Sequence, residues 1–443
     1  AQLVVLLVLA IGIDYSLFLI SRIREEERGG KDYRSAVVVA RSTTGVAILW
    51  SGLIVALSLC GLFLMGDTVL ASMALVSIIS VLVTVLGSVY VLPSILLLLG
   101  RRLEFGRLPI LGSRKERPLL KSWWLRLSLE FPMRTVLALS VLFAALTYFA
   151  LQLQLGSTVE PTLLPRTMQS YHAFQHLERE FPDFAGIDFS VIVWGDRVDE
   201  HEDEGEFDEF YDVLNSYDSV RGPIYTEYSE DGSLLRMHFV ALGWGNNPVN
   251  LNLIHDLRGE VFPKYFEPLG LSASVSGTLP FVVDDIDRYT QRTPTVFSVV
   301  LLLSLTFLLV AFRSIVVPIK AIVLNILSTL AAFGVLVLAF QKSGVPGWSF
   351  EVIESFVPPL LFSILFGLSM DYHVFLMSRV NEEFLRGKDT KAAVRSGIES
   401  TFRTITGAAL IMVSVFVIIA TLELPIMKEL GFGLAVAVLL DAT

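Results

Sequence analysis

The chain of 443 residues has little cysteine, little charge and no motif for nucleotide binding. Its single cysteine, Cys60, lies within an apolar run, so a disulfide framework is excluded. Charged residues make up only 18% of the chain, whereas hydrophobic residues make up 53%. The mean hydropathy of +0.64 is well above that of a soluble globular protein. No Gly-x-x-x-x-Gly-Lys-Ser/Thr loop occurs, so this chain cannot bind ATP in the usual way and energy would have to come from an ion gradient.

The chain contains several long apolar runs. Several reach or exceed the roughly 18 residues that a helix needs to cross a bilayer. They occupy residues 45–65, 68–99, 135–151, 295–311, 321–340, 355–377 and 405–422. The stretches before Ser21 and after Met427 are also apolar but look incomplete. We therefore expect nine membrane spans, the first and last incomplete, in a piece of a longer polypeptide.

The distribution of charge predicts the orientation of the chain. Residues 156–290 contain 25 acidic and 8 basic residues, whereas basic residues elsewhere gather in short connections between the apolar runs. Because cytoplasmic loops of membrane proteins carry an excess of Lys and Arg, we expect these connections to be cytoplasmic and the acidic block to lie outside.

The predicted fold is mainly α and polytopic, with an internal repeat and one α+β extracytoplasmic domain. Membrane helices are expected at residues 1–20, 135–155 and 355–378, with two helices in each of 45–100, 293–340 and 404–443. Cytoplasmic segments are expected at residues 21–44, 101–134 and 379–403. External segments are expected at residues 156–292 and 341–354.

The external block, residues 156–292, predicts a domain with its own core. Its expected elements, in chain order, are a strand at 188–194, a helix at 204–216, a hairpin at 220–228 and 234–242, a helix at 247–262 and a strand at 271–276. This order is the split βαβ pattern of ferredoxin-like domains. A further helix from Asp284 to Arg292 should lead directly into the next membrane span.

Two stretches of the chain, 357 residues apart, repeat one motif within apolar helices. Gly-Ile-Asp-Tyr-Ser-Leu-Phe-Leu-Ile-Ser-Arg begins at Gly12, and Ser-Met-Asp-Tyr-His-Val-Phe-Leu-Met-Ser-Arg begins at Ser369. From Asp14 and Asp371 onward, 8 of 13 aligned positions are identical. A carboxylate in the middle of a membrane span is costly and usually marks an ion or proton pathway. Self-similarity between the two ends of a membrane chain is typical of transporters built from repeats.

The repeated aspartates have the chemistry of proton carriers. An ionised carboxylate at mid-span must find a partner or become neutral. A group that exchanges its proton near neutral pH can load on one side of the membrane and release on the other. The tyrosine next to each aspartate can hydrogen-bond the carboxylate without adding a charge. The predicted relay residues are Asp14, Tyr15, Asp371 and Tyr372, and a purely structural role for them stays open.

Four further residues are predicted to line this relay: Phe18, Phe375, Ser51 and His373. Each phenylalanine lies four residues after an aspartate, on the same helix face, where it could exclude water. Ser51, on the next span, could complete a polar chain, and Gly367 allows close approach of a neighbouring helix. His373 is turned roughly 160° from Asp371. Its role stays open between tuning of the pH dependence and a polar contact between helices.

Both motif helices resemble the paired proton-relay helices of the MmpL-type branch of the RND superfamily. The resemblance covers essentially the whole chain. It implies an RND-type bundle of twelve helices with two ferredoxin-like porter domains, of which this chain would retain the fourth to the twelfth helix and the second porter domain. It also implies a proton antiporter of the cytoplasmic membrane, not an enzyme, that exports lipids or other hydrophobic or amphiphilic molecules. Phe18, Phe375 and Ser51 resemble positions that line the relay and, in mycolate-lipid exporters, an inhibitor pocket. His373 departs from the expected pattern, in which an acidic residue follows the tyrosine.

Two other functions stay open. A protein-translocation component related to SecDF would share the architecture, although that branch has an Asn-Val segment after the aspartate and then Phe-Glu-Arg. A non-transporting sterol-sensing or scaffold protein would not need both Asp-Tyr pairs.

The expected partners are a lipid or hydrophobic small-molecule substrate, membrane lipids and accessory membrane proteins, with no nucleic acid. We expect no cofactor, because the proton gradient supplies the energy, and no metal, because His172 and His176 lack an apparent third ligand. The glutamate pairs after each motif, at 25–26 and 382–383, are interpreted as a solvated helix face.

Overall fold

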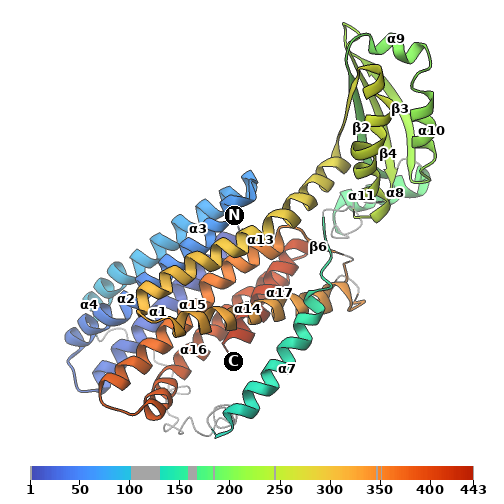
Figure 1. Ribbon diagram of the computed structural model, residues 1–443. Helices are drawn as coiled ribbons and strands as arrows, with labels where there is room; N and C mark the ends of the chain where they lie inside the picture. Colours follow the sequence, from blue (N-terminus) through green and yellow to red (C-terminus); the bar gives the residue numbers. More distant parts are fainter. Residues whose placement is uncertain are drawn as a thin grey trace.

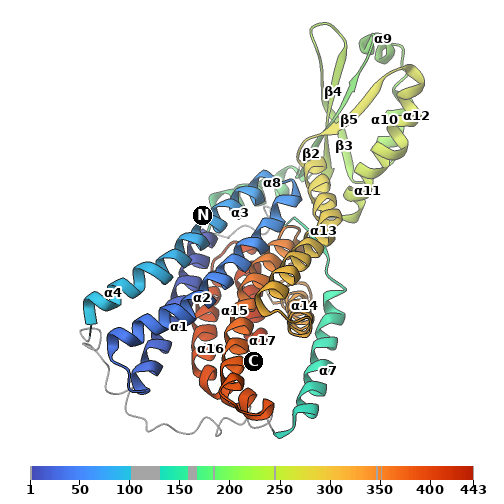
Figure 2. The same ribbon diagram turned by 60° about the vertical axis from the view of Figure 1, so that its left-hand side comes forward.

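The protein consists of a bundle of long apolar helices and a smaller α+β domain that stands at one end of the bundle (Figure 1, Figure 2). This computed structural model describes residues 2–100, 130–157, 167–182, 185–243, 246–345, 348–350 and 352–442. Within these ranges, seven helical segments are long and apolar enough to cross a membrane, and each overlaps one of the seven apolar runs of the sequence. They are Tyr33–Met65, Thr68–Leu99, Pro132–Ala150, Thr278–Val310, Val316–Gln341, Val357–Leu385 and Thr390–Ala420.

Helices from both ends of the chain build the bundle. Its elements are α1 (Gln2–Arg28), α2 (Tyr33–Cys60), η1 (Gly61–Met65), α3 (Thr68–Leu86), η2 (Gly87–Val91), α4 (Leu92–Leu99), α7 (Pro132–Ala150), α13 (Thr278–Phe312), α14 (Val316–Leu336), η9 (Val337–Gln341), α15 (Val357–Leu385), α16 (Thr390–Ala420) and α17 (Pro425–Asp441). Helices α1 and α17 occupy the two ends that were expected to be incomplete spans. Their crossing of the membrane and the expected inside and outside boundaries stay predictions, and most of the expected linker 101–134 lies outside the described residues.

The two halves of the repeat begin their second helix in the same way. The side chain of Asp32 accepts a hydrogen bond from the backbone N–H of Ser35 at the start of α2. Asp389 accepts the equivalent bond from Ala392 at the start of α16. A carboxylate at this position satisfies an N–H group that has no partner within the helix. The shared cap explains why both helices begin directly after the turn that the two halves of the repeat have in common.

Gly367 allows α15 to approach α2 closely. A Cβ atom at Gly367 would lie only 2.9 Å from the Cα of Val55 in α2. Real Cβ atoms do not approach a backbone carbon so closely, so any larger residue would push the two helices apart. This contact holds the segment of α15 that precedes its Asp-Tyr motif against α2.

Replacing Gly367 with alanine is therefore expected to destabilise the bundle by about 2 kcal/mol, as overpacking of a tight contact does. The matched control is Gly407→Ala in α16, where an added Cβ meets nothing within 4 Å. That control should be neutral or stabilising by up to about 1 kcal/mol, because alanine favours the helix. Thermal unfolding of both variants in detergent measures the difference. Equal melting temperatures for the two variants would contradict close packing at Gly367.

The α+β domain contains one antiparallel sheet with helices beside it. In chain order its elements are α8 (Gln169–Glu180), β2 (Gly186–Trp194), α9 (Val198–Asp203), α10 (Asp208–Asn215), β3 (Val220–Tyr228), β4 (Leu234–Leu242), α11 (Pro248–Asp256), η7 (Leu257–Val261), α12 (Phe262–Tyr265), η8 (Glu267–Leu269) and β5 (Ser272–Ser276). The strand order is β3-β4-β2-β5. The predicted hairpin and both predicted helical regions are confirmed. The ferredoxin-like class and the role of a porter domain stay predictions.

Buried aromatic rings form the core of this domain. Phe189 of β2 stacks on Phe239 of β4, with ring centroids 5.4 Å apart, and both side chains are fully buried. Phe207, Phe210 and Phe266 pack edge to face in the layer of helices beside the sheet. Their burial holds the domain together without a disulfide, as the sequence requires.

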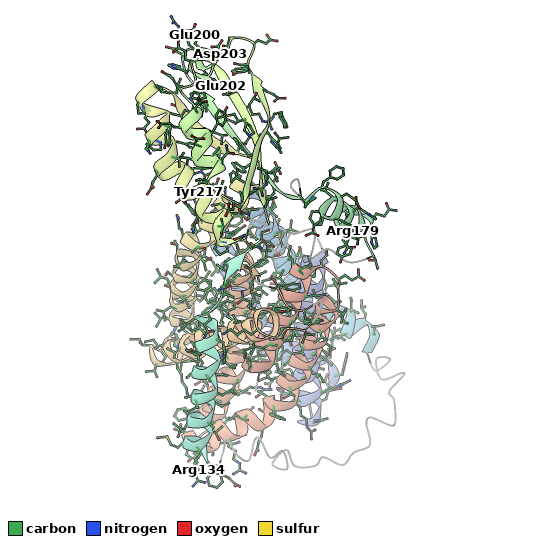
Figure 3. All side chains as sticks on the ribbon, turned by 90° about the vertical axis from the view of Figure 1, so that its right-hand side faces the viewer. Arg134, Arg179, Glu200, Glu202, Asp203 and Tyr217 are labelled. Atoms are coloured by element: carbon green, nitrogen blue, oxygen red, sulfur yellow. The ribbon has the colours of Figure 1, made fainter. Side chains whose placement is uncertain are left out.

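Charged residues lie at both ends of the long axis of the molecule. Figure 3 places Glu200, Glu202 and Asp203 at the far tip of the α+β domain, and Arg134 at the opposite end of the bundle. Between them, α13 leaves the α+β domain as one continuous helix and runs into the bundle, as predicted for the stretch after Asp284 (Figure 1). A short parallel ladder of β1 (Leu155–Gly156) with β6 (Ile353–Glu354) ties the base of the domain to the bundle.

Candidate functional site

The first Asp-Tyr pair lies inside the bundle, on α1. Asp14 and Tyr15 are 2% and 1% exposed. The hydroxyl groups of Tyr15 and Ser51 share a buried hydrogen bond of 2.9 Å, which joins α1 to α2. The structure therefore brings together three of the residues that the sequence singled out. A short polar chain inside an apolar bundle is what a proton pathway requires, because each member can pass or hold a proton.

The second Asp-Tyr pair belongs to α15, which contacts α1 through aromatic rings. Phe18 of α1 contacts Phe375 of α15, with ring centroids 4.5 Å apart, and lies 6.5 Å from the ring of Tyr372. The hydroxyl of Tyr372 points to the sulfur of Met412 at 3.7 Å. Asp371 belongs to α15, but its side chain lies outside the described part of the structure. The aromatic contacts nevertheless join the two motif helices at the level of the motif.

A small cavity of about 20 Å³ lies beside Tyr15. Phe18, Phe375 and Ser51 line it together with residues of α2. This volume is enough for about one water molecule. The three predicted lining residues thus gather around one site next to the first Asp-Tyr pair.

His373 lies elsewhere. It does not line the cavity beside Tyr15, and its imidazole is within electrostatic reach of Asp441 at the end of α17. The expected position on nearly the opposite helix face from Asp371 stays a prediction, because the side chain of Asp371 lies outside the described part of the structure. The partner on α17 carried no sequence signal, because Asp441 is not part of the repeat.

A network of ion pairs links the two motif helices near their C-terminal ends. Arg22 of α1 lies 2.7 Å from Glu26, 3.2 Å from Glu25 and 3.4 Å from Glu382 of α15. Arg379 of α15 lies 2.7 Å from Glu382 and also pairs with Glu25 of α1. The arginine side chains are only 4% and 10% exposed. The interpretation of the glutamates as a merely solvated face is wrong for these residues, since each repeat supplies partners to the other.

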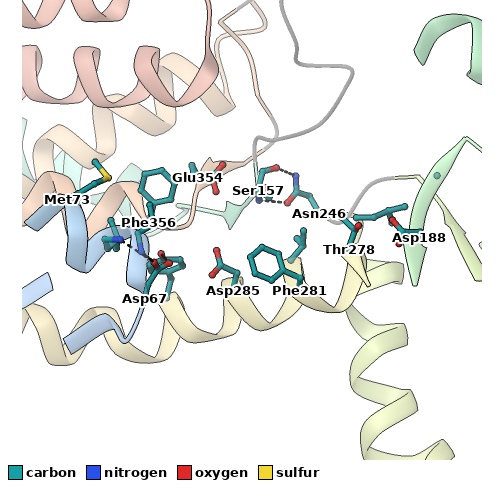
Figure 4. A pocket seen from close by; sticks show the side chains of 16 residues that line it. Asp67, Met73, Ser157, Asp188, Asn246, Thr278, Phe281, Asp285, Glu354 and Phe356 are labelled. Carbon is teal, nitrogen blue, oxygen red and sulfur yellow. Dashed lines mark hydrogen bonds between the residues drawn. The ribbon is translucent and has the colours of Figure 1, made fainter. Parts of the chain in front are cut away.

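A larger cavity of about 510 Å³ lies between the α+β domain and the N-terminal ends of α3 and α13 (Figure 4). Among the sixteen described residues that line it, four are carboxylates and none is basic. The carboxylates are Asp67, Asp188, Asp285 and Glu354. Apolar side chains complete the wall, among them Phe281, which is 65% exposed. Sequence reasoning missed this site, because its walls come from segments that are distant in the chain.

Asp67 anchors the bundle side of this cavity. Its carboxylate caps α3 by accepting backbone N–H bonds from Val69 and Leu70, and it accepts a 2.6 Å bond from the hydroxyl of Tyr289. Burial raises the pKa of this carboxyl group, but the hydrogen bond from Tyr289 and the backbone bonds outweigh burial, so the net pKa lies below the ordinary value. Arg292 of α13 donates to the backbone oxygens at the end of η1 beside it.

The substitution Asp67→Asn should reduce stability by about 1 kcal/mol at neutral pH, since charge-assisted hydrogen bonds become neutral ones while the cap is kept. Because the folded pKa is below the unfolded value of about 3.9, the stabilisation is present above that value and is lost as pH falls through the folded pKa. Melting temperatures of variant and wild type should therefore converge only at pH values below the folded pKa of Asp67. Tyr289→Phe, which removes one donor, should reproduce part of the effect. A loss that is independent of pH would refute this account of Asp67.

Comparison with known proteins identifies the family of this chain. The MMPL family model matches residues 1–135 and 162–443. The mycolic acid-containing lipids exporter MmpL11 of Mycolicibacterium smegmatis is 30% identical over 454 residues, which cover 98% of this chain and 46% of that protein. The heme uptake protein MmpL11 of Mycobacterium tuberculosis is 31% identical, covering 98% and 45%. The trehalose monomycolate exporter MmpL3 of Mycobacterium tuberculosis is 28% identical, covering 100% and 50%.

Solved structures show the same architecture. SecDF of Thermus thermophilus, a translocon-associated membrane protein, has a TM-score of 0.58 at 15% identity, covering 99% of this chain and 52% of that chain. At this identity the likeness concerns the fold alone. This chain spans about half the length of the curated relatives that it matches. The predicted branch is confirmed: the chain belongs to the MMPL family, and its long apolar helices make it a multi-pass protein of the cytoplasmic membrane.

Proposed function

We propose that the full-length protein exports lipids or other hydrophobic or amphiphilic molecules and that protons drive the export. The observation that carries this proposal is the buried pair Asp14 and Tyr15, hydrogen-bonded through Tyr15 to Ser51 and packed through Phe18 against the second motif helix. An acidic side chain that is buried in an apolar helix bundle costs free energy. Such residues are usually functional, and a role as proton carrier accounts for this one.

The energy for export would come from protons that bind and leave this relay. Each proton that moves through the membrane potential supplies about 2.3 kcal/mol per 100 mV. Asp14 on α1 and Asp371 on α15 are the two carriers, with Tyr15 and Tyr372 as their hydrogen-bonding partners. In this proposal, protonation favours one packing of α1 against α15, and release of the proton favours another. Proton movement is thereby coupled to a conformational change of the bundle, which antiport requires.

The outer cavity supports a particular class of cargo. Its four carboxylates favour a cationic, zwitterionic or neutral headgroup over an anionic one. Its apolar wall, with the exposed ring of Phe281, suits an acyl chain or another apolar group. The names of the relatives include exporters of mycolic-acid lipids, which agree with an amphiphilic cargo, and a heme uptake protein. We therefore assign the α+β domain the role of a porter domain, on the extracytoplasmic side of the membrane, with the cargo held at its base.

Protein translocation is the weaker alternative. The fold is shared with SecDF, but the sequence matches lie in the MMPL family. A sterol-sensing or scaffold role leaves the two Asp-Tyr pairs without a purpose. Lipid export by proton antiport accounts for the relay, the acidic cavity and the family together.

Photocrosslinking tests this function. The full-length protein in proteoliposomes is given photoactivatable amphiphiles with cationic, zwitterionic or anionic headgroups, with and without an imposed pH gradient. We expect the cationic and zwitterionic probes to be exported only with the gradient and to label peptides that contain Phe281. Asp188→Asn with Asp285→Asn should raise labelling by the anionic probe, since repulsion is reduced. Export that survives a protonophore, or labelling confined to the cytoplasmic segments, would overturn the proposal.

A further inference from the structure

A third cavity, of about 550 Å³, lies in the half of the bundle that contains the C-terminal end of α15. Helices α2, α13, α14, α15 and α16 all contribute to its wall, and none of the sixteen described residues that line it is charged. Large apolar side chains lie at its rim, where Val46, Trp50 and Phe384 are 45%, 39% and 53% exposed. We call it the lateral cavity, because this rim is exposed on the side of the bundle. Its volume lies within the range of about 300–1,000 Å³ that is usual for ligand sites.

The wall of the lateral cavity changes from apolar to polar along the helices. Helices α2 and α15 are antiparallel here, because Val55 lies against Gly367, whereas Ala47, earlier in α2, shares a cavity with Phe375, later in α15. The part of the wall nearest to the middle of the bundle is apolar and contains Trp50, Ile54, Phe307 and Val374. The part nearest to the C-terminal end of α15 contains the polar residues Thr43, Ser314, Ser378, Asn381 and Thr390. Such a wall fits an amphiphile whose tail points toward the middle of the bundle.

Two basic side chains lie next to the polar end of the lateral cavity. Arg313 lies in the turn between α13 and α14, and Lys391 in the first turn of α16, each beside a residue of the polar wall. Both are exposed, and neither has an ion-pair partner among the residues that the structure describes. Two nearby carboxylates already have partners, since Glu383 pairs with two basic side chains and Asp389 caps α16. The remaining positive charge favours an anionic headgroup at this end.

We propose that the lateral cavity binds an anionic phospholipid of the surrounding membrane. One acyl chain lies between α2, α13 and α15, and the phosphate group lies at Arg313 and Lys391. This lipid is a resident ligand and not the cargo, because the four carboxylates at the base of the α+β domain repel an anionic headgroup. The site goes beyond the proposed function and does not depend on how export is driven.

The bound lipid should stabilise the packing of α2 against α15. Ala47 lines both the lateral cavity and the small cavity beside Tyr15. On α15, Val374 lines the lateral cavity, and its neighbour Phe375 lines the small one. An acyl chain in the lateral cavity therefore lies one layer of side chains from the first Asp-Tyr pair. Because a ligand that binds only the folded protein stabilises it, anionic phospholipid should raise the melting temperature.

Fluorescence of Trp50 tests occupancy, because this indole lines the lateral cavity and bromine atoms quench a nearby indole. Full-length protein is placed in phosphatidylcholine vesicles that contain a minor fraction of brominated phosphatidylglycerol. Subtracting the signal of Trp50→Phe isolates this residue from the other tryptophans. We expect Arg313→Gln and Lys391→Gln each to weaken the quenching interaction about fivefold, the effect of one basic residue beside an anionic lipid. Lys342→Gln, which replaces an exposed lysine near the other end of α14, is the matched control and should change nothing.

A variant that fills the cavity gives an independent measurement. Ser378 is exposed and lines the lateral cavity, so Ser378→Phe should occupy part of its volume. Added phosphatidylglycerol should then raise the melting temperature of the wild type but not of Ser378→Phe. Equal quenching of Trp50 by brominated phosphatidylcholine, or quenching that Trp50→Phe leaves unchanged, would overturn the proposal. Stronger quenching by a brominated cationic lipid would make the cavity a site for cargo and would also overturn it.

Discussion

Replacing Asp14 with asparagine is expected to reduce proton-driven export by the full-length protein at least about 100-fold, the usual contribution of a positioned proton-transfer group. The amide has almost the same shape as the carboxyl group, so it fills the buried site on α1, but it cannot take up and release a proton. Asp371→Asn, in the second copy of the motif, is expected to have the same effect. Transport in proteoliposomes with an imposed pH gradient measures both variants.

The matched control is Asp32→Asn. Asp32 caps α2 at an exposed turn, and asparagine is an equally good cap, so this variant should transport and melt like the wild type. All three variants should be expressed and inserted normally, because no packing is lost. Undiminished export by Asp14→Asn would rule out the relay as the coupling site.

The substitution Arg22→Ala is expected to destabilise the bundle by about 3 kcal/mol, as removal of one partner from a buried ion pair does. Arg22 is 4% exposed and pairs with Glu26, which is 12% exposed, and with Glu382 on α15. Its loss removes one cation from Glu26 and breaks the link to α15. Thermal unfolding in detergent measures the effect. Arg24→Ala is the matched control, since Arg24 is exposed on the same helix and should be nearly neutral.

A charge exchange distinguishes the link between helices from a local effect on α1. Arg379 of α15 pairs with Glu25 of α1. The variant Arg379→Glu should be destabilised, and adding Glu25→Arg should restore part of the lost stability, because the pair is rebuilt with its charges reversed. No recovery in the double variant would mean that the two helices are not coupled at this end.

Local features of the sequence determined the secondary structure and the class of the protein. The length of the apolar runs predicted seven helices that the structure contains, and the turn sequence Ser229-Glu230-Asp231-Gly232 between two strand-like stretches predicted the hairpin of β3 and β4. The repeated Asp-Tyr motif predicted the family. It also predicted that Tyr15, Ser51, Phe18 and Phe375 belong to one site. These predictions succeed because helix and strand periods and turn residues act over a few positions.

Tertiary structure alone decided which side chains face one another. The ion pair between Arg22 and Glu382 and the hydrogen bond between Tyr289 and Asp67 join residues that are 360 and 222 positions apart. Each depends on which face one helix turns to its neighbour, and close contacts such as Gly367 on Val55 set that face. Such packing is a property of the whole bundle. Spacing within a single helix therefore predicts where a polar group lies along the helix, but not the partner it finds across the interface.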